Sequence, residues 1–193
     1  MITHIQGKLT QKNPTNVVID CNGIGYLVNI SLHTFSQIPD QENLKLLTHL
    51  HIKEDSHTLY GFYSFAEREI FRLLISVSGI GTSTARTMLS SLTPKQVREG
   101  IASEDVSLIQ SVKGIGLKTA QRVIIELKDK VLKIYDIDEG LSFQSNTNKD
   151  EALSALEVLG FAKKQSERVV DKIISNQTDI SVETIIKEAL KNL

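Results

Sequence analysis

Cysteine is almost absent from this chain of 193 residues, because Cys21 is the single one. One cysteine cannot form a disulfide within the chain, so the fold has to be held by packing alone. The same count excludes an iron-sulfur cluster and any zinc site built from several cysteines. We expect Cys21 to be an unreactive small apolar residue beside a turn.

Aromatic residues and long apolar runs are also scarce. Trp is missing and aromatic residues make up 5% of the chain, which argues against a surface that stacks single-stranded bases. No apolar run reaches the roughly 18 residues that cross a bilayer, and the opening MITHIQGKLT lacks the apolar region of a secretory signal. We therefore expect a soluble, cytoplasmic protein with no membrane partner.

The net charge of -1 conceals three segments of different charge. Residues 1–66 carry a net charge of -1. Residues 67–133 carry +4, from eleven basic and seven acidic residues, and residues 134–193 carry -4. A basic middle between a near-neutral start and an acidic end predicts three units with different partners.

The first unit, residues 1–63, has the pattern of a small β-barrel. Short runs rich in Val, Ile, Leu and Tyr are separated by turn signals such as Asn22-Gly23 and Pro39-Asp40. Five or six short strands at this spacing favour a closed sheet, and the five-stranded OB type fits best among barrels of this length. The predicted strands are residues 1–9, 16–21, 26–31, 44–53 and 58–63.

The second unit, residues 64–135, changes abruptly to a helical period. Ser64 as N-cap and Glu67 three residues later predict a reciprocal capping box, followed by a helical apolar face. Further helix starts are predicted at Thr93, with Pro94 in the first helical position, and at Ser103. The middle of the chain is therefore expected to be all helical.

The third unit follows a polar stretch without periodicity, residues 136–149, which we interpret as a flexible linker. Residues 150–193 hold three short helical patterns, at 152–159, 163–174 and 181–190. A three-helix bundle of this size is near the lower limit for folding alone, and is more typical of a docking module than of a catalyst. The predicted fold class is thus α+β, in several domains.

The middle unit contains an internal repeat. SVSGIGTSTARTML at residues 76–89 aligns with SVKGIGLKTAQRVI at residues 111–124, at an offset of 35, with seven of fourteen positions identical. Two copies are too few for a solenoid. They indicate two equivalent structural motifs within one domain.

Each copy predicts a hairpin between two helices. The two glycines allow a turn with positive φ and a close approach of the backbone to another molecule. Ile80 and Ile115, between the glycines, are expected to point into the helix pair and hold the hairpin. The following helix begins at once, so its first N–H groups point outward and form a site for an anion such as phosphate.

This arrangement resembles the helix-hairpin-helix motif, whose hairpins hold duplex phosphates through backbone amides without reading bases. Lys118 would add a point charge in the second copy, where the first copy has Ser83. The predicted DNA-contacting residues are Gly79, Ile80, Gly81, Ser83 and Arg86 in the first copy, and Lys113, Gly114, Ile115, Gly116, Lys118, Thr119 and Arg122 in the second.

Other interpretations of these glycines are weaker. Each Gly-x-Gly can simply join two helices of an ordinary bundle, but two matched copies in a basic segment disfavour that alternative. Leu117 stands where a P-loop needs glycine, and neither copy has the third glycine of a dinucleotide fingerprint.

Glu54 and Asp55 fall between two predicted strands. Adjacent carboxylates there are usually a solvated turn, but near a phosphate-binding surface they would repel backbone strands. They are too isolated for a metal site. His49 and His51 share a strand face without an obvious partner and are interpreted as surface or structural residues. No catalytic triad or paired acid–base set stands out.

Together these segments closely resemble the RuvA family of bacterial Holliday-junction branch-migration subunits, over essentially the whole chain. The resemblance is carried by GIGY at 23–26, KEDSHTLYGF at 53–62, both hairpins with KGIGLKTAQRVIIELKD at 113–129, the polar linker, and LGF at 159–161. The second hairpin and the barrel stretch are specific, whereas the tail alone would be weak.

The resemblance implies a homotetramer with fourfold symmetry that holds a four-way junction open, in recombination, DNA repair and the SOS response. It places an acidic pin on Glu54 and Asp55. It also implies a tail, with Leu159, Gly160 and Phe161, that binds the hexameric ATPase RuvB, and a RuvC resolvase as a further candidate partner. The chain itself would need no cofactor. Many relatives carry a basic residue where this chain has Ser83, so the first hairpin is expected to hold DNA less tightly.

Two alternatives from other functional classes stay open at this point. A nuclease or glycosylase could use the same hairpins to hold its substrate, but would need a carboxylate cluster or a catalytic acid against the groove. A protein-interaction scaffold with helices that never meet DNA would bind no four-way junction. The number of tetramers on a junction, one or two, is open as well.

Overall fold

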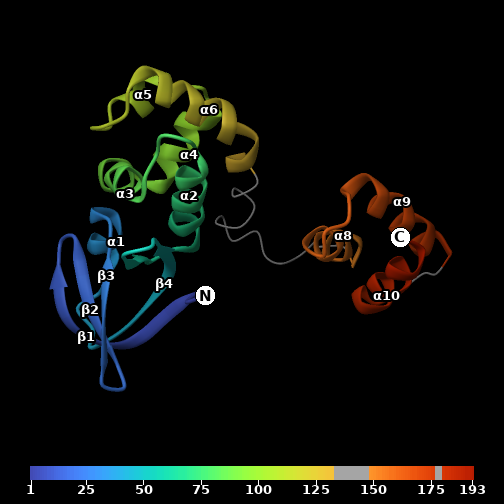
Figure 1. The fold of residues 1–193 in the computed structure, drawn as a ribbon, viewed down its shortest axis with the longest axis horizontal. Coiled ribbons are helices and arrows are strands. Elements are labelled where there is room, and N and C mark those ends of the chain that lie inside the picture. Colours follow the sequence, from blue (N-terminus) through green and yellow to red (C-terminus); the bar gives the residue numbers. More distant parts are fainter. Residues whose placement is uncertain (133–147, 177–179) are drawn as a thin grey trace. The chain divides into compact units, whose positions relative to one another are not determined.

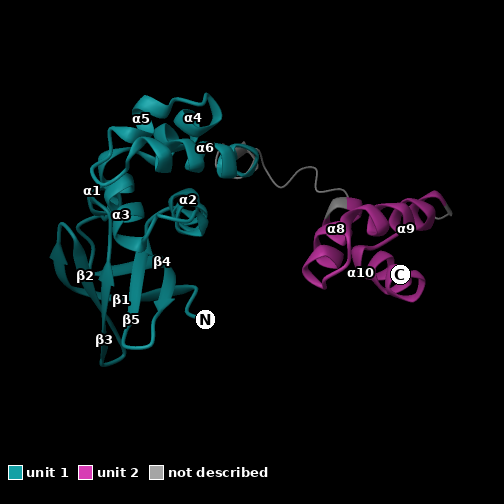
Figure 2. Cartoon of the chain, turned by 45° about the horizontal axis from the view of Figure 1, so that its top comes forward, with its two compact units in different colours: residues 1–140 teal, residues 141–193 magenta. Residues whose placement is uncertain are grey.

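The computed structural model describes residues 1–132, 148–176 and 180–193. The chain divides into two compact units, one of residues 1–140 and one of residues 141–193 (Figure 2). The first unit combines a β-barrel with a helical domain, and the second is all helical (Figure 1). The predicted α+β class is confirmed. Among the described residues, no helix is long and apolar enough to cross a membrane.

The N-terminal barrel is closed and has five strands, as predicted. The strand order is β1-β2-β3-β5-β4, and β4 pairs with β1 to close the sheet. All neighbouring strands are antiparallel except β3 and β5, where Val28 lies opposite Leu59 in a parallel pair. Because side chains alternate across a strand, every second residue points inward, and the interior is filled by Val17, Ile19, Val28, Ile30, Leu44 and Leu46. The strands are β1 (His4–Asn13), β2 (Asn16–Cys21), β3 (Ile24–Asn29), β4 (Asn43–Ile52) and β5 (His57–Phe62).

β2 has the predicted bounds, whereas both ends of the other strands differ from the prediction by one to four residues. The largest differences are in β1, which begins at His4 and extends beyond residue 9 to Asn13, and in β3, which extends back to Ile24 and ends at Asn29 instead of residue 31. The end of β1 pairs with β2, with Lys12 opposite Val17, after a register shift between Leu9 and Gln11. These extensions are held by backbone pairing in an exposed ribbon, so their side chains lack the apolar alternation that marks a half-buried strand.

A short helix that the sequence did not predict, α1 (Leu32–Gln37), connects β3 to β4. Its N-cap is Ser31, whose hydroxyl accepts a hydrogen bond from the Thr34 amide at 2.9 Å. Six residues make less than two turns, so no helical period can be recognised. The capping serine was the available signal.

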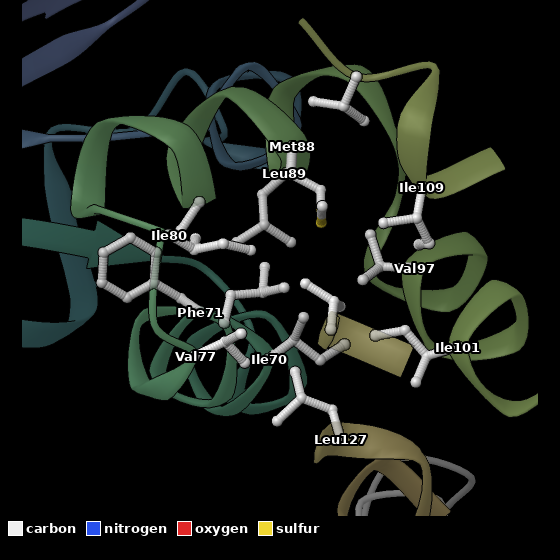
Figure 3. Packing of buried hydrophobic residues seen from close by; sticks show 14 of the residues in the cluster. Ile70, Phe71, Val77, Ile80, Met88, Leu89, Val97, Ile101, Ile109 and Leu127 are labelled. Carbon is white, nitrogen blue, oxygen red and sulfur yellow. The ribbon is translucent and has the colours of Figure 1, made fainter. Parts of the chain in front are cut away.

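The middle domain is all helical, as predicted, with α2 (Phe65–Ser76), α3 (Thr82–Ser91), α4 (Pro94–Ala102), α5 (Val106–Gln110) and α6 (Leu117–Leu132). Its helices bury one continuous core that includes Phe71, Leu74, Met88, Leu89, Val97, Ile101, Ile109 and Leu127. Figure 3 shows labelled members of this core, among them Phe71, Met88, Val97 and Leu127, converging from separate helices. The predicted apolar face around Ile70 and Phe71 is therefore the buried face of α2.

Helix starts are confirmed at Thr93 and partly corrected elsewhere. Thr93 forms a complete capping box with Gln96. The start predicted at Ser103 is wrong: Ser103 ends α4, and the N-cap of α5 is Asp105, whose carboxylate accepts from the Leu108 amide at 3.0 Å.

The capping box predicted for Ser64 and Glu67 is also half wrong. Ser64 accepts from the Glu67 amide at 3.2 Å, as expected. The Glu67 carboxylate does not return to Ser64; it is fully buried and accepts hydrogen bonds from the hydroxyls of Ser31 and Thr34. Glu67 therefore joins α2 to the start of α1, a tertiary contact that no local pattern specifies.

Within its described residues, 148–176 and 180–193, the second unit contains the helices α8 (Asn148–Val158), α9 (Lys163–Asn176) and α10 (Val182–Asn192), around a core of its own. Residues 148 and 149, predicted as the end of the linker, belong to α8. Residues 136–147 of that linker, and 177–179 of the predicted turn before α10, lie outside the described residues. The turn at Gly160 is confirmed, because this glycine has a φ of +97° and lies two residues after the last residue of α8, Val158.

Candidate nucleic-acid interface

The two copies of the sequence repeat form equivalent hairpins. In the first, between α2 and α3, the Ile80 amide donates to the Val77 carbonyl at 3.0 Å. In the second, between α5 and α6, the Ile115 amide donates to the Val112 carbonyl at 3.1 Å. Each pair lies at the offset of 35 residues, so the repeat in sequence is a repeat in structure.

The isoleucines hold the hairpins in place, as predicted. Ile80 and Ile115 each expose 5% of their surface and belong to the core of the helical domain. Figure 3 shows Ile80 pointing toward Phe71 and Leu89. A buried isoleucine between two exposed glycines holds the tip of the hairpin against the domain. The backbone of the tip stays on the surface.

Positive φ is confined to the first glycine of each hairpin. Gly79 has a φ of +97° and Gly114 a φ of +93°. The second glycines do not turn the chain in this way: Gly81 has a φ of -86° and is the N-cap of α3, and Gly116 lies outside the left-handed region. The left-handed turn of each hairpin is therefore made by its first glycine, Gly79 or Gly114.

The second glycines face open space. A Cβ atom added at Gly81 or Gly116 would meet no atom of the protein within 4 Å. The protein's own packing and backbone therefore do not require glycine at either position. Gly81 also supplies no side chain to accept from the first amides of α3, so those N–H groups are available to an outside acceptor.

The hairpins lie side by side. Arg122, on the helix after the second hairpin, donates from Nη1 to the carbonyl oxygen of Ser78 in the first, at 3.1 Å. A Cβ atom on Gly79 would lie 3.9 Å from the Thr119 hydroxyl. The structure thus brings Thr119 and Arg122 of one copy next to the backbone of the other.

The predicted basic side chains fall into two groups. Lys113, Lys118 and Arg122 are exposed around the second hairpin, and Ser83 is exposed at the position equivalent to Lys118. Arg86 is half-buried, and its Nη1 donates to the Asn29 side-chain oxygen at 3.0 Å and to the Thr15 carbonyl at 3.4 Å. Arg86 is therefore turned toward the barrel.

Glu54 and Asp55 lie where the sequence placed them. Both are exposed in the turn between β4 and β5, which is closed by a bond from the Lys53 amide to the Ser56 carbonyl at 2.8 Å. The Ser56 hydroxyl donates to Asp55 at 3.2 Å. The two carboxylates thus stand at the tip of a strand pair, where they lower the local potential.

The remaining candidates are accounted for by packing. His49 is half-buried with its ring edge against Phe71, and burial lowers the pKa of its imidazole. The Cys21 thiol donates to the Gln6 carbonyl at 3.2 Å. Within the part of the chain that the structure describes, no group of three or more His, Cys, Asp or Glu residues could hold a metal ion.

Comparison with known proteins decides the family. The family profile "RuvA N terminal domain" matches residues 1–61, "SAM-like Helix-hairpin-helix tandem" matches 71–129, and "RuvA, C-terminal domain" matches 147–193. Relatives from Flavobacterium psychrophilum and Christiangramia forsetii are each 67% identical over the full length of both chains. One from Bacteroides thetaiotaomicron is 47% identical, again over both full lengths. Each bears the name "Holliday junction branch migration complex subunit RuvA". The chain belongs to the RuvA family.

The three profiles coincide with the elements described above. The RuvA N-terminal profile covers the barrel up to Gly61 on β5, and the tandem profile contains both hairpins. The RuvA C-terminal profile begins one residue before α8.

In the RuvA C-terminal region, the predicted partner-binding residues differ in exposure. Leu159 is 58% exposed and Val158, which the sequence analysis did not single out, is 85% exposed. Both line a shallow hollow with Glu151, Ser154, Ala155 and Ile186. Phe161 instead packs against the core of the second unit, and its amide donates to the Leu156 carbonyl. Gly160 provides the left-handed turn between the exposed Leu159 and the packed Phe161.

Three residues that sequence reasoning missed lie between the barrel and the first hairpin. The Tyr60 hydroxyl donates to Thr82 at 3.0 Å, and Asn29 accepts from Arg86. Thr82 and Arg86 are four residues apart and so share one face of α3. The i, i+4 spacing of Thr82 and Arg86 was the signal available in the sequence. It did not indicate that their partners would be Tyr60 and Asn29 of the barrel.

Proposed function

We propose that this chain is a non-catalytic DNA-binding subunit. It recognises four-way Holliday junctions by shape and phosphate contacts, holds them open and recruits the RuvB ATPase for branch migration. The name shared by the relatives describes a subunit of a branch-migration complex. The sequence resemblance adds a homotetramer acting in recombination and repair. We assign residues 1–63 to the barrel with the acidic pin, 64–135 to DNA binding, 136–149 to a linker and 150–193 to motor binding.

The observation that carries this proposal is the open space at the second glycines. Gly81 and Gly116 have neither a positive φ nor a neighbour within 4 Å of a Cβ position. An alanine would fit both sites within the protein itself, so the lack of a side chain serves the approach of another molecule. Outward amides at a helix start bind anions, and in DNA that anion is a backbone phosphate.

The contacts proposed here select for shape and not for base sequence. Backbone amides and the ammonium of Lys118 reach phosphates, which are the same on every nucleotide. Two hairpins tied together by Arg122 and Ser78 would hold phosphates at a fixed separation. Four such pairs around a fourfold axis fit four duplex arms, whereas a linear duplex would engage them only in part.

The acidic turn, which is the β4–β5 turn with Glu54 and Asp55, supports the proposed separation of DNA strands at the junction. Glu54 and Asp55 are exposed at the tip of the β4–β5 pair and place two negative charges at one point. Like charges repel, so phosphate strands that approach this turn would be kept apart. The pair would contribute little to affinity and would act on the conformation of the crossover.

The second unit supports the recruitment of RuvB. Val158 and Leu159 expose apolar surface at the end of α8, beside the Gly160 turn. Exposed apolar residues grouped in this way are typical of a contact with another protein. We assign motor binding to this end of α8, with Leu159 as its central residue and Phe161 holding the turn in place.

A competition assay between a labelled four-way junction and linear duplex of equal length tests the proposal. Preferential binding to the junction, insensitive to its base sequence, supports it. Equal affinity for both DNAs contradicts it. Metal-dependent cleavage of the junction by the pure protein would favour a nuclease, and no binding at low salt would favour an interaction scaffold.

A further inference from the structure

One face of α3 carries three polar side chains that all meet the barrel or its connecting helix. They are Thr82, Arg86 and Ser90, at positions i, i+4 and i+8, so they lie in one row along the helix. Residues on the other side of α3, Ala85, Met88 and Leu89, are fully buried in the helical core. Figure 1 shows α3 on the side of the helical domain that faces α1 and the barrel.

Each member of this row has a partner. Thr82 accepts from the Tyr60 hydroxyl on β5 at 3.0 Å. Arg86 donates to the Asn29 side chain, at the end of β3, at 3.0 Å. The Ser90 hydroxyl accepts from the Leu32 amide at the start of α1 at 3.1 Å. The contacts span the full length of α3, and the guanidinium contact is charge-assisted and so among the stronger hydrogen bonds of its kind.

The second copy of the repeat serves as an internal comparison. At the offset of 35, Thr82, Arg86 and Ser90 correspond to Leu117, Gln121 and Ile125. In α6 these residues point to solvent: Leu117 is 50% exposed, Ile125 is 81% exposed and Gln121 is also exposed. The second hairpin folds in the same way without such a row, so the polar row of α3 is not needed to form a hairpin.

The row connects two parts of the proposed DNA surface. Thr82 directly follows Gly81, the N-cap of α3, so its bond to Tyr60 reaches the first residue of the helix after the hairpin. Tyr60 lies on β5, and the turn that begins this strand carries Glu54 and Asp55. One hydroxyl–hydroxyl bond therefore links the first hairpin to the strand that bears the acidic pair.

We propose that Thr82, Arg86 and Ser90, with Tyr60 and Asn29 as partners, form a joint that sets the position of the first hairpin relative to the acidic turn. Arg86 is then a positioning residue and not a phosphate ligand, in contrast to the role expected from the sequence. This inference rests on the proposed DNA-binding function. Under this proposal, the first hairpin binds DNA phosphates through its backbone amides alone, independently of base sequence.

The salt dependence of junction binding distinguishes between Arg86 as a phosphate ligand and Arg86 as a positioning residue. A side chain that neutralises a phosphate contributes about 0.9 to the slope of log affinity against log salt concentration, through the release of a counterion. We expect Arg86→Gln to weaken junction binding about fivefold to tenfold with a slope changed by less than about 0.3. The matched control is Lys118→Gln, which removes an exposed cation from the second hairpin and should lower the slope by about 0.9.

A double-mutant cycle tests whether Arg86 acts through Asn29. Asn29→Ala leaves every charge in place and removes the acceptor of the Arg86 bond. It should reproduce the affinity loss of Arg86→Gln, and the double variant should bind no more weakly than either single one. Because Asn29→Ala is a small truncation at a strand end, it keeps the test usable if Arg86→Gln fails to fold.

Tyr60→Phe tests the link to the acidic turn. This change removes one hydroxyl and keeps the ring that packs on Phe71, with centroids 5.1 Å apart. At saturating protein, so that affinity no longer matters, a fluorescent base analogue at the crossover should report less strand separation than with the wild type. A residue of merely structural importance would lower the unfolding temperature without changing this signal in the saturated complex.

The outcomes separate this inference from the function on which it rests. If the wild type shows no preference for a junction, the proposed function fails and the joint has no role in it. If the wild type and Lys118→Gln behave as expected but Arg86→Gln lowers the slope by about 0.9 and Asn29→Ala binds normally, Arg86 contacts phosphate and the inference alone is overturned. Normal strand separation by saturated Tyr60→Phe would overturn the link to the acidic turn.

Discussion

Arg122 donates a hydrogen bond from Nη1 to the carbonyl oxygen of Ser78, at 3.1 Å, and so fastens the helix of the second hairpin to the loop of the first. The two residues are 44 positions apart in the chain. Arg122 is otherwise exposed, so its remaining donors face solvent at the place where both hairpins meet. The separation between the hairpins is therefore held by a contact within the proposed DNA-binding surface itself.

The second glycines, Gly81 and Gly116, should be replaceable with little change in stability but not without loss of DNA binding. Gly116→Ala has room for its methyl group and an unstrained backbone. The lower entropy of the unfolded chain offsets the poorer fit of alanine at a helix start, so we expect stability to change by less than about 1 kcal/mol. Junction affinity should fall at least about tenfold, because the methyl group blocks the approach of phosphate. Thermal unfolding and gel-shift titration measure the two effects.

Gly23→Ala is the matched control for the first glycines. Gly23 has a φ of +90° and open surroundings in the β2–β3 turn, like Gly114 in its hairpin. Both alanine variants should lose about 1–2 kcal/mol of stability, but only Gly114→Ala should lose affinity beyond what its stability explains. Normal junction binding by Gly116→Ala and Gly114→Ala, alone and combined, would refute the role of the hairpins.

A lysine at position 83 should strengthen the first hairpin. Ser83 is exposed and equivalent to Lys118 in the repeat, so Ser83→Lys places an ammonium where the second hairpin already has one. We expect tighter junction binding at low salt and a log–log salt slope steeper by about 0.9. The reverse change, Lys118→Ser, should make the slope shallower by the same amount. An unaltered slope for Ser83→Lys would mean that the first hairpin does not meet phosphate.

Neutralising the acidic turn should not weaken binding. Glu54→Gln together with Asp55→Asn keeps the size of two exposed side chains and removes two negative charges. We expect junction affinity to stay the same or to rise, most clearly at low salt, because repulsion of phosphates is removed. Strand separation at the crossover, followed with a fluorescent base analogue, should decrease. Weaker binding by this variant would contradict a repulsive role.

The buried Glu67 makes stability depend on pH in a predictable direction. Burial raises the pKa of its carboxyl above the ordinary value of 4.5, although bonds from Ser31 and Thr34 partly oppose this. The folded protein therefore holds this proton more tightly than the unfolded chain. Its stabilising effect is fully present below pH 4.5 and is lost as pH rises through the raised pKa.

Glu67→Gln should remove that pH dependence. The amide can keep contacts with both hydroxyls and has no charge to bury, so the unfolding temperature should change less between pH 5 and 8 than in the wild type. Glu67→Ala should instead cost about 1–3 kcal/mol at every pH, since the Ser31 and Thr34 hydroxyls lose their acceptors. The same pH profile for Glu67→Gln and wild type would show that another group is responsible.

The exposed end of α8 should be needed for the motor and not for DNA. Leu159→Asp in the full chain changes a residue that is 58% exposed, so the second unit should still fold. We expect unchanged junction binding and a loss of stimulation of RuvB ATPase activity and of branch migration, as for a chain ending near Tyr135. Phe161→Ala is the contrasting variant, because it removes a core contact and should lower the unfolding temperature. Intact branch migration by Leu159→Asp would remove the assignment.

The sequence alone determined the features that depend on local chemistry. The alternation of apolar residues predicted the barrel, the repeat predicted twin hairpins with buried Ile80 and Ile115, and Thr93 predicted a helix start. Each of these follows from residues within a few positions of one another, where period, capping and backbone freedom act directly.

Only the tertiary structure decided which distant residues meet. Glu67 was predicted to cap its own helix but is buried against Ser31 and Thr34. Arg86 was predicted to face DNA but is turned to Asn29. The physical reason is the same in both cases: a polar side chain takes the partner that folding brings nearest when it loses water, and that partner lies dozens of residues away, beyond the reach of any local pattern.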